Sequence, residues 1–271
     1  MRHSGTPPCL ARLSSWLVAG LAVVMATAGP AQAQDPRTAA KEWEVRLGGA
    51  VALRPDFPGA SDLRIGPVPV IDITYDRRYF LNSANGLGAL VFAEKLGELK
   101  YVLGGALSPS FDTRDASDIP GLDKIGTTAL ARAFARVFLG RWSFDITAAQ
   151  DILGEGHTGL WAETALAYSI KIHDRGLFRA GAVLRMGSGD YIDALYSVSA
   201  AESDRSGLPA FNASAGLERA GVEMSLLYPV GAHWDIVSVA SYNRQIADAE
   251  DSPVTQDADQ IRLLLGLAYR F

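Results

Sequence analysis

The stretch QIRLLLGLAYRF, Gln260–Phe271, closes the chain and shows the pattern that decides its fold. Every odd position from Ile261 to Phe271 is apolar or aromatic, whereas the even positions include Gln260, Arg262 and Arg270. Successive side chains of a β-strand point to opposite faces, so one face of this segment is apolar and the other is mixed. An aromatic end without a polar tail is expected where a last strand finishes at a membrane interface, because aromatic rings settle at that level.

The same alternation recurs along the whole chain and predicts twelve strands. Most of these segments are close to the roughly 9–11 residues that a tilted strand needs to cross a bilayer. The third and fourth segments are the shortest. The predicted strands are residues 43–53, 67–75, 78–83, 86–93, 100–110, 127–139, 142–150, 158–172, 177–187, 217–229, 233–246 and 260–271.

The connections between these segments alternate in length. With the N-terminus in the periplasm, the connections at the periplasmic end are short, for example "GR" and "HDRG". Those at the other end include the long stretch from Ser188 to Gly216. Short turns on one rim and long loops on the other are typical of outer-membrane barrels.

Aromatic residues gather at the rim with the short turns, on the predicted outward face. Alternation alone would also suit a soluble sandwich or a lipocalin-like barrel. An aromatic girdle at one end of the strands favours a membrane interface instead. We therefore predict an all-β, transmembrane, antiparallel up-and-down β-barrel of about 12 strands, with short periplasmic turns and long extracellular loops. The girdle residues are Trp43, Tyr75, Phe92, Tyr101, Trp142, Phe178, Tyr228, Trp234, Tyr269 and Phe271.

The first 33 residues have the features of a cleaved secretory signal. Two arginines precede an apolar run at 13–28, and Ala31 and Ala33 occupy the small-residue positions of a cleavage site before Gln34. A membrane anchor is the alternative, but the run is shorter than the roughly 20 residues that span hydrocarbon. We expect a signal at 1–33 and a barrel at 34–271.

Charge and cysteine content exclude several function classes. Without the two signal arginines, the chain carries 23 Lys+Arg against 30 Asp+Glu, so nucleic acid is an unsuitable partner. Its one cysteine, Cys9, lies within the predicted signal, which leaves no disulfide, thiol nucleophile or cysteine metal site. We expect no cofactor and no metal.

Longer stretches resemble the MipA/OmpV family of Gram-negative outer-membrane proteins, the MltA-interacting proteins. They are "RPDFPGASDLRIGPVPVIDITY" (54–75), "NGLGA" (85–89), "SGLPAFNASAGL" (206–217), "YNRQIADAEDSPV" (242–254) and the terminal "GLAYRF". The family usually has Tyr where this chain has Phe57 and Phe211. The motif residues singled out in these stretches are Pro55, Gly59, Ser61, Asp62, Arg64, Pro67, Pro69, Ser206, Gly207, Leu208, Pro209, Asp251, Ser252 and Pro253.

The prolines and glycines of the first motif are expected to shape a loop and the start of a strand rather than contact a ligand. The chain's ending also resembles the signal that the barrel-insertion machinery reads. Gly266, Tyr269 and Phe271 match that signal, whereas Leu264 stands where a polar residue is usual.

The resemblance implies an outer-membrane barrel of a Gram-negative bacterium that acts as a scaffold for murein synthesis and remodelling. Its implied partners are a murein lytic transglycosylase and a penicillin-binding protein, besides outer-membrane lipid and lipopolysaccharide. Other members of the family are described as surface adhesins, so an adhesin that acts through the long outer loops is a further alternative for this chain. No residue of this chain can be matched to a docking motif, because the family has none that is agreed.

Catalysis by a Ser–His pair finds little support. Ser169 and His173 share one strand face but lie about 13 Å apart at roughly 3.3 Å per residue. A direct hydrogen bond needs about 2.6–3.2 Å. His173 and His233 border short turns and His157 lies in an outer loop, where all three are expected to be solvated. We predict that the protein is not an enzyme.

Charged residues on the predicted inward face leave two hypotheses open. They are compatible with a small-solute or ion channel, or with internal ion pairs that fill the barrel. Eight strands leave almost no bore and sixteen leave a channel, so the strand number does not decide. We favour a filled or narrow lumen, with 188–216 long enough to fold inward as a plug, and we expect the acidic outer loops to be solvated. The inward charges are Arg46, Asp72, Arg132, Arg136, Asp145, Glu163, Arg179, Arg185, Glu223 and Arg262.

Overall fold

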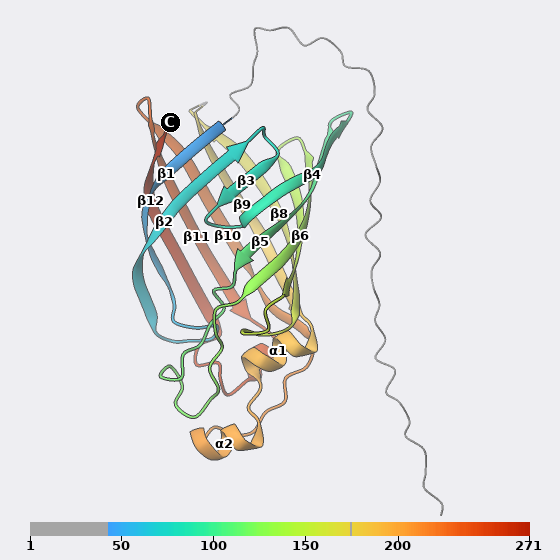
Figure 1. Cartoon of the computed structure of the whole chain (residues 1–271), viewed down its shortest axis with the longest axis vertical. Coiled ribbons are helices and arrows are strands. Elements are labelled where there is room, and N and C mark those ends of the chain that lie inside the picture. Colours follow the sequence, from blue (N-terminus) through green and yellow to red (C-terminus); the bar gives the residue numbers. More distant parts are fainter. Residues whose placement is uncertain (1–42, 174) are drawn as a thin grey trace, which may run out of the picture. The chain divides into compact units, whose positions relative to one another are not determined.

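A computed structural model describes residues 43–173 and 175–271, which form one closed antiparallel barrel (Figure 1). Each strand pairs with its neighbours in sequence, and the last strand pairs with the first. No helix in this part of the chain is long and apolar enough to span a membrane. The predicted cleavage site lies outside the described residues. The strands are β1 (Trp43–Pro55), β2 (Leu63–Tyr75), β3 (Tyr79–Asn82), β4 (Gly86–Leu96), β5 (Leu99–Pro109), β6 (Ala129–Leu139), β7 (Trp142–Asp151), β8 (Leu160–Ile172), β9 (Gly176–Gly187), β10 (Gly216–Val230), β11 (Trp234–Gln245) and β12 (Asp259–Arg270).

The pairing of β12 with β1 closes the barrel. The register runs from Arg46 opposite Arg270 to Leu53 opposite Leu263. The amide of Phe271 donates a hydrogen bond to the carbonyl of Val45 at 3.1 Å, so the ladder continues to the last residue. An open seam in hydrocarbon would leave backbone groups without partners, at several kcal/mol each. Closure thus pairs the backbone of β12 as far as the aromatic residue Phe271.

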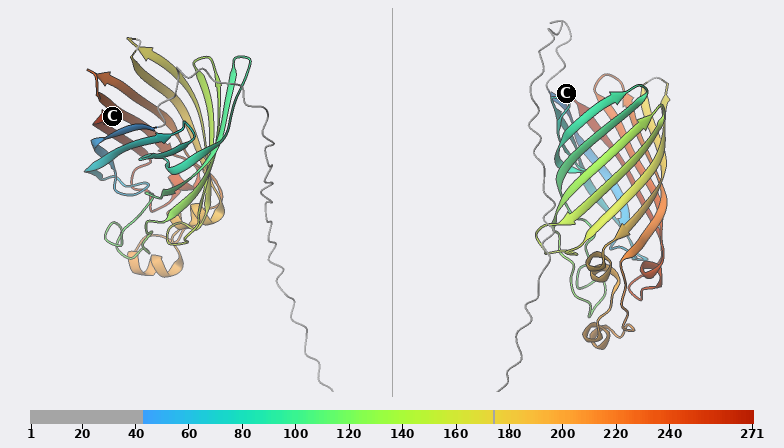
Figure 2. Two further views of the ribbon diagram at one scale, coloured as in Figure 1. Left: turned by 45° about the horizontal axis from the view of Figure 1, so that its top comes forward. Right: turned by 90° about the vertical axis from the view of Figure 1, so that its right-hand side faces the viewer.

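The two ends of the barrel differ as predicted (Figures 1 and 2). The connections at the periplasmic end are two or three residues long: 76–78, 97–98, 140–141, 173–175 and 231–233. The outer connections are 56–62, 83–85, 110–128, 152–159, 188–215 and 246–258. The three helices lie in these outer connections: α1 (Gly189–Tyr196), α2 (Ala200–Ser206) and α3 (Asp248–Asp251).

Aromatic rings of neighbouring strands contact one another at the periplasmic rim. The ring centroids of Trp43 and Tyr75 are 4.6 Å apart, and those of Phe92 and Tyr101 are 5.5 Å apart. Two aromatics that the sequence analysis omitted belong to the same girdle. They are Tyr79, whose ring stacks on Tyr75, and Tyr168, whose ring meets Trp142 edge-on.

The predicted start of the second strand was wrong. β2 begins at Leu63 instead of residue 67, because β1 pairs with it as far as Pro55 opposite Leu63. The first outer loop is correspondingly shorter, at 56–62. Pro67 and Pro69 therefore lie inside a strand and do not mark its start. β3 is only four residues long, whereas β4 extends to Leu96.

The seam between β1 and β12 admits only a very small residue at position 48. A Cβ added to Gly48 would lie 1.9 Å from the carbonyl oxygen of Leu267, whereas one added to the adjacent Gly49 would meet nothing within 4 Å. We predict that Gly48→Ala lowers the free energy of unfolding by about 1–3 kcal/mol, as overpacking does. Gly49→Ala should leave it unchanged. Urea unfolding in lipid vesicles measures both variants, and equal stabilities would contradict the prediction.

Candidate functional site

The outer connections fold together into a cap, which we define as residues 56–62, 110–128, 152–159, 188–215 and 246–258 (Figures 1 and 2). Local signals set its helices. The Ser188 side chain accepts a hydrogen bond from the Tyr191 amide and begins α1. Ser199 and Glu202 form a capping box at the start of α2. Gly207, at φ +76°, ends α2 in the left-handed conformation that favours glycine.

Two buried apolar clusters hold the cap together. In the first, Tyr191, Ile192 and Leu195 of α1 pack against Leu130 and Trp161 at the outer ends of β6 and β8. The loop 188–215 therefore covers the outer end of the barrel as a cap. The second cluster joins residues from four separate loop segments. Its members are Phe57, Ala60, Ile119, Leu122, Val198 and Val254, with Leu208 and Phe211 packed against them.

In the first family-like stretch, 54–75, hydrogen bonds and one ion pair fix the conformation of the loop 56–62. Gly59, at φ +93°, accepts hydrogen bonds from the amides of Gln256 and Asp257. Ser61 binds the Gln256 side chain, and the carbonyl of Asp62 accepts from the Asp56 amide. Arg64 pairs with Asp56 at 2.8 Å. The loops after β1 and β11 thus dock on each other.

Two further family-like stretches, 206–217 and 242–254, also form part of the cap. The first contains the end of α2, and the second contains a loop that docks on α1. The hydroxyl of Ser206 donates to the carbonyl of Glu202 and accepts from the Leu208 amide. Ser252 donates to the carbonyl of Tyr196, which ties the last loop to α1. Asp251 and Pro209 are exposed, and Pro253 lies between two residues buried in the cap. The structure therefore brings stretches far apart in sequence into one cap.

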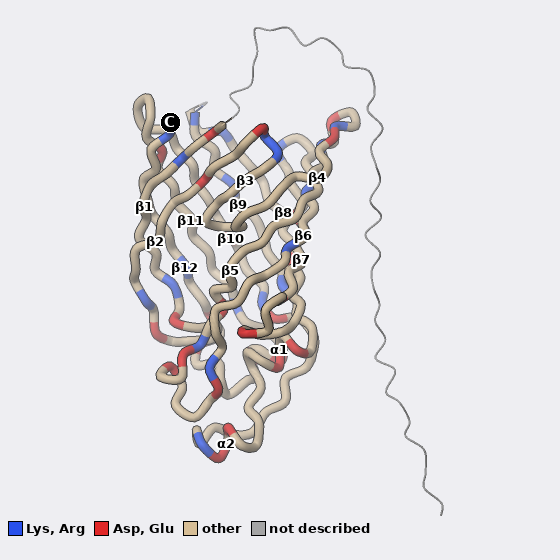
Figure 3. The backbone as a smooth tube through the Cα atoms, in the orientation of Figure 1, with Lys and Arg blue, Asp and Glu red and all other residues tan. Residues whose placement is uncertain are grey.

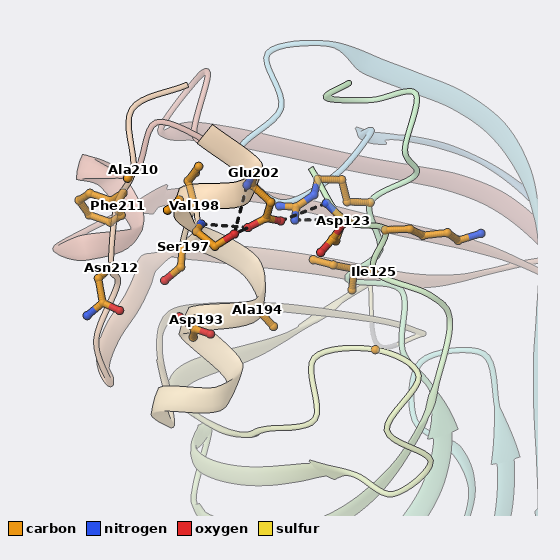
Figure 4. Close-up of a pocket in the computed structure, with 15 residues that line it drawn as sticks. Asp123, Ile125, Asp193, Ala194, Ser197, Val198, Glu202, Ala210, Phe211 and Asn212 are labelled. Carbon is orange, nitrogen blue, oxygen red and sulfur yellow. Dashed lines mark hydrogen bonds between the residues drawn. The ribbon is translucent and has the colours of Figure 1, made fainter. Parts of the chain in front are cut away.

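A pocket of about 580 Å³ opens in the cap between residues 110–128 and the helices α1 and α2 (Figure 4). Arg114 lines it, is 4% exposed, and donates to the carbonyls of Leu195 and Asp123 at 3.1 and 3.2 Å. Burial lowers the pKa of Arg114. Phe211 and Glu202 stand on other walls of the pocket. The lining thus mixes both signs of charge with one aromatic ring.

A charged cluster beneath the cap joins it to the barrel wall. Glu218 is buried at a β-bulge in β10 and accepts hydrogen bonds from the hydroxyls of Tyr191 and Tyr196 at 3.2 and 3.0 Å. Arg185 pairs with Glu163 at 2.9 Å and reaches Glu218 at 3.9 Å. Its guanidinium also lies 4.0 Å from the ring centroid of Trp161.

The same cluster includes a carboxylate from the loop after β5. Asp112 pairs with Arg185 at 3.3 Å. Burial raises the pKa of Asp112, but Arg185, Arg219 and Arg262 outweigh it and hold that pKa at about 2. Part of this acidic loop is therefore an internal ion-pair partner, although the sequence suggested a solvated loop. Burial and the nearby Glu218 raise the pKa of Tyr191, which keeps its hydroxyl a donor.

Further ion pairs lie nearer the periplasmic end. Arg46 pairs with Asp72 at 2.9 Å and with Asp235 at 3.1 Å. Asp145 pairs with Arg136 and, at 2.6 Å, with Arg179. These contacts connect β1 with β2 and β11, and β7 with β6 and β9.

Three of the predicted inward charges have no ion pair in the described part of the chain. The guanidinium of Arg132 lies 5.3 Å from the ring of Trp161, which is a cation–π contact. Arg262 and Glu223 make neither an ion pair nor a hydrogen bond among the residues described. Arg262 acts on Asp112 through its charge alone.

Sequence reasoning missed Glu218 for a physical reason. It is adjacent to Arg219, and alternation would put two adjacent side chains on opposite faces. The register shift between Leu217 and Arg219 breaks that rule, so that both side chains take part in the charged cluster. Two adjacent charges at the start of a membrane strand were the only signal. Asp235, which binds Arg46, was also missed.

The prediction that His157 is a solvated loop residue was wrong. Its side chain is fully buried, its ring lies 4.7 Å from that of Tyr191, and neither of its nitrogens has a hydrogen-bond partner within residues 43–173 and 175–271. Burial lowers its pKa. In the described residues no hydrogen bond joins a serine to a histidine, and no group of three or more His, Cys, Asp or Glu is placed to hold a metal.

The tyrosine contacts predict how firmly the cap is held. Tyr196→Phe removes the donor to Glu218 and the acceptor of a 3.0 Å hydrogen bond from Gln245. We expect the opening free energy of α1 to fall by about 1.5–3 kcal/mol, the range for a hydrogen bond to a charged group. Hydrogen exchange of the α1 amides measures it. Tyr242→Phe, which removes an exposed bond to Asp259, is the control, and equal exchange in both variants would contradict the assignment.

His157 predicts a loss of cap stability in acid. Its pKa is about 6.5 when unfolded and lower in the folded cap. As pH falls below the unfolded value, the open loop gains a proton that the folded cap rejects, so stability present at higher pH is lost. Hydrogen exchange of α1, corrected for intrinsic rates, should show weaker protection at about pH 5.5 than at about 7.5.

His157→Phe keeps a ring against Tyr191 and removes the titration. Its protection should be the same at both pH values. Asp112, with a pKa of about 2, remains ionised throughout this interval. Asp151, Arg185 and Glu218 also act on the imidazole through their charges. An unchanged pH dependence in the variant would assign the effect to another group.

Comparison with known proteins identifies relatives of this barrel. The outer-membrane protein YiaT of Escherichia coli K12, a provisional description, is 27% identical over 202 residues, which cover 73% of this chain and 80% of that relative. Among solved structures, OmpT of Vibrio cholerae folded in vitro is 10% identical with a TM-score of 0.37, covering 84% of this chain and 96% of that one. Ail of Yersinia pestis is also 10% identical, with a TM-score of 0.22, covering 84% and 97%. Because these TM-scores are below 0.5, we draw nothing from them.

A family model described as "MltA-interacting protein MipA" matches residues 47–271, from the first strand to the terminus. The match begins within β1 and includes the other eleven strands and every loop of the cap. The chain therefore belongs to the MipA family and is an outer-membrane β-barrel.

Proposed function

We propose that this barrel is a non-enzymatic outer-membrane anchor that holds a murein lytic transglycosylase, and through it a penicillin-binding protein, at the periplasmic rim. The observation that carries the proposal is the match to a family described by its interaction with MltA. MltA is a murein transglycosylase, and murein lies in the periplasm. An anchor for such an enzyme must therefore bind it through the periplasmic end of the barrel.

The charges of the periplasmic turns support this side of the barrel. Arg77, Arg78, Arg141 and Arg175 lie in three of the short turns and are exposed. The outer loops carry mostly Asp and Glu (Figure 3). Exposed guanidinium groups bind carboxylates in bidentate geometry and guide the approach of an acidic partner. We infer that these four arginines contact carboxylates on the docked enzyme.

A channel fits these features less well. The cap covers the outer end of the barrel, and ion pairs engage most of the inward charges. A pathway through the barrel would need the cap to detach from Glu218 and Trp161. An anchor needs neither an open pathway nor a catalytic group.

The proposal predicts which surface captures the enzyme. Bait protein solubilised from envelopes should enrich a lytic transglycosylase, identified by mass spectrometry. Replacing Arg77, Arg78, Arg141 and Arg175 with Glu should abolish the enrichment, because the partner's carboxylates would then be repelled.

The control places two charge reversals of the same kind on the cap. Lys124→Glu and Arg205→Glu alter exposed outer-loop cations and should leave enrichment unchanged. Enrichment of no murein enzyme by the wild-type bait would reject the anchor. Equal loss in both sets of variants would reject the periplasmic turns as the contact.

A further inference from the structure

The barrel wall is incomplete along the outer half of β2. β2 pairs with β1 along its whole length, from Trp43 opposite Tyr75 to Pro55 opposite Leu63. On its other side it pairs with β3 over Asp72–Tyr75 only. The segment 63–71 therefore has a strand partner on one side alone (Figure 1). We call this break in the wall, between 63–71 of β2 and the outer ends of β4 and β5, the notch.

The unpaired edge of the notch lies among lipid-facing side chains. Ile65 on β2 is 71% exposed, and Leu63 beside it is also exposed. Leu87 of β4 and Leu107 of β5 are exposed too and lie opposite each other at the outer end of those strands. Hydrocarbon therefore surrounds the notch on the outside. An unpaired backbone group there is unfavourable.

Three residues remove or satisfy backbone groups along this edge. Ser83 donates its amide to the carbonyl of Ile71 at 3.0 Å, and its hydroxyl accepts from the Ile71 amide at 2.9 Å and donates to the carbonyl of Pro69 at 2.8 Å. These bonds show that the odd residues of β2 direct their backbone groups towards the notch. Pro67 and Pro69 occupy two such positions and have no N–H to leave unpaired.

Pro67, Pro69 and Ser83 stabilise the edge of β2 without a strand that would fill the notch. A strand from another protein would need amide donors along the edge, and the prolines remove two of them. A longer β3 would have paired the edge, but β3 ends at Asn82. Proline and Ser83 thus reduce the number of unpaired backbone groups on this edge without a strand partner.

The part of β2 that lines the inner side of the notch is apolar. Gly66, Val68 and Val70 alternate with the outward prolines, so no charged side chain of β2 faces the lumen between 66 and 70. Across the notch, the rings of Phe80 and Phe134 lie 6.0 Å apart.

Two glycines let these rings lie against the wall. A Cβ added to Gly88 would be 2.4 Å from the ring of Phe80, and one added to Gly104 would be 2.3 Å from the ring of Phe134. Because Gly88 and Gly104 have no side chain, the rings cover β4 and β5 closely. The inner surface beside the notch is consequently aromatic.

We propose that an acyl chain of the surrounding lipid enters the barrel through the notch and lies against Phe80 and Phe134. The exposed leucines outside, Val68 and Val70 on the inner face of β2, and the two rings are all apolar, which suits hydrocarbon. A polar solute finds no hydrogen-bonding side chain on β2 between 66 and 70. A peptide strand finds an edge with two donors missing.

Photolabelling in proteoliposomes tests the proposal. The bilayer contains a trace of phospholipid with a diazirine on its acyl chain or, in a second arm, a free fatty acid with the same group. Irradiation followed by peptide mass spectrometry locates the label. We expect label on Val68, Val70 and Phe134, and the arm that gives it identifies the source of the chain.

The alternation of β2 provides an internal control. Pro67 and Pro69 face the bilayer on the same peptide and should be labelled in every sample. Label on these outward residues without label on Val68, Val70 or Phe134 in either arm would overturn the proposal.

A matched pair of tryptophan variants tests whether the acyl chain enters through the notch. A Cβ at Gly66 or at Gly49 meets nothing within 4 Å, but position 66 faces inward and position 49 faces the bilayer. Gly66→Trp should abolish the inward label and keep the outward label, whereas Gly49→Trp should keep both. Inward label that persists in Gly66→Trp overturns the proposal. If Gly66→Trp does not fold, judged by heat-sensitive electrophoretic mobility, the inward and outward labels of the wild-type protein decide.

Discussion

The need of every backbone N–H and C=O in hydrocarbon for a partner governs this structure. It requires β12 to pair with β1 up to Phe271, and it leaves Gly48 no room for a side chain at that seam. At β2 the same requirement is met for part of the edge without a strand. Proline removes the donor at two positions, and Ser83 binds the next groups along the edge. Closure and the notch are two solutions to one constraint.

The cap depends on the barrel for its polar contacts. Glu218, turned inward by a bulge, fixes α1 through two tyrosine hydroxyls, and Arg185 fixes the loop after β5 through Asp112. Buried charges of this kind require partners, because an unpaired buried charge is costly. The inward charges thus orient the cap as well as fill the lumen.

The sequence predicted twelve strands and their two faces because alternation is a local signal, readable in each segment alone. The same assignment of faces also predicted the aromatic girdle, in which the rings of Trp43 and Tyr75 are in contact. The features that the sequence did not predict depend on how strands pair with one another. The edge position of Pro67 follows from the shortness of β3, and the burial of Glu218 follows from a register shift against β9. His157 is buried by loops from elsewhere in the chain, for which no local pattern exists.

These features together give the two ends and the wall of the barrel different neighbours. The cap separates the lumen from the outer medium, while the short turns leave the periplasmic rim exposed. The notch then joins the interior to the bilayer through an apolar lining at Val68 and Phe134. Such an arrangement suits a protein that fixes a periplasmic partner to the membrane, because the short turns leave the periplasmic rim free for that partner while the strands hold the barrel in lipid.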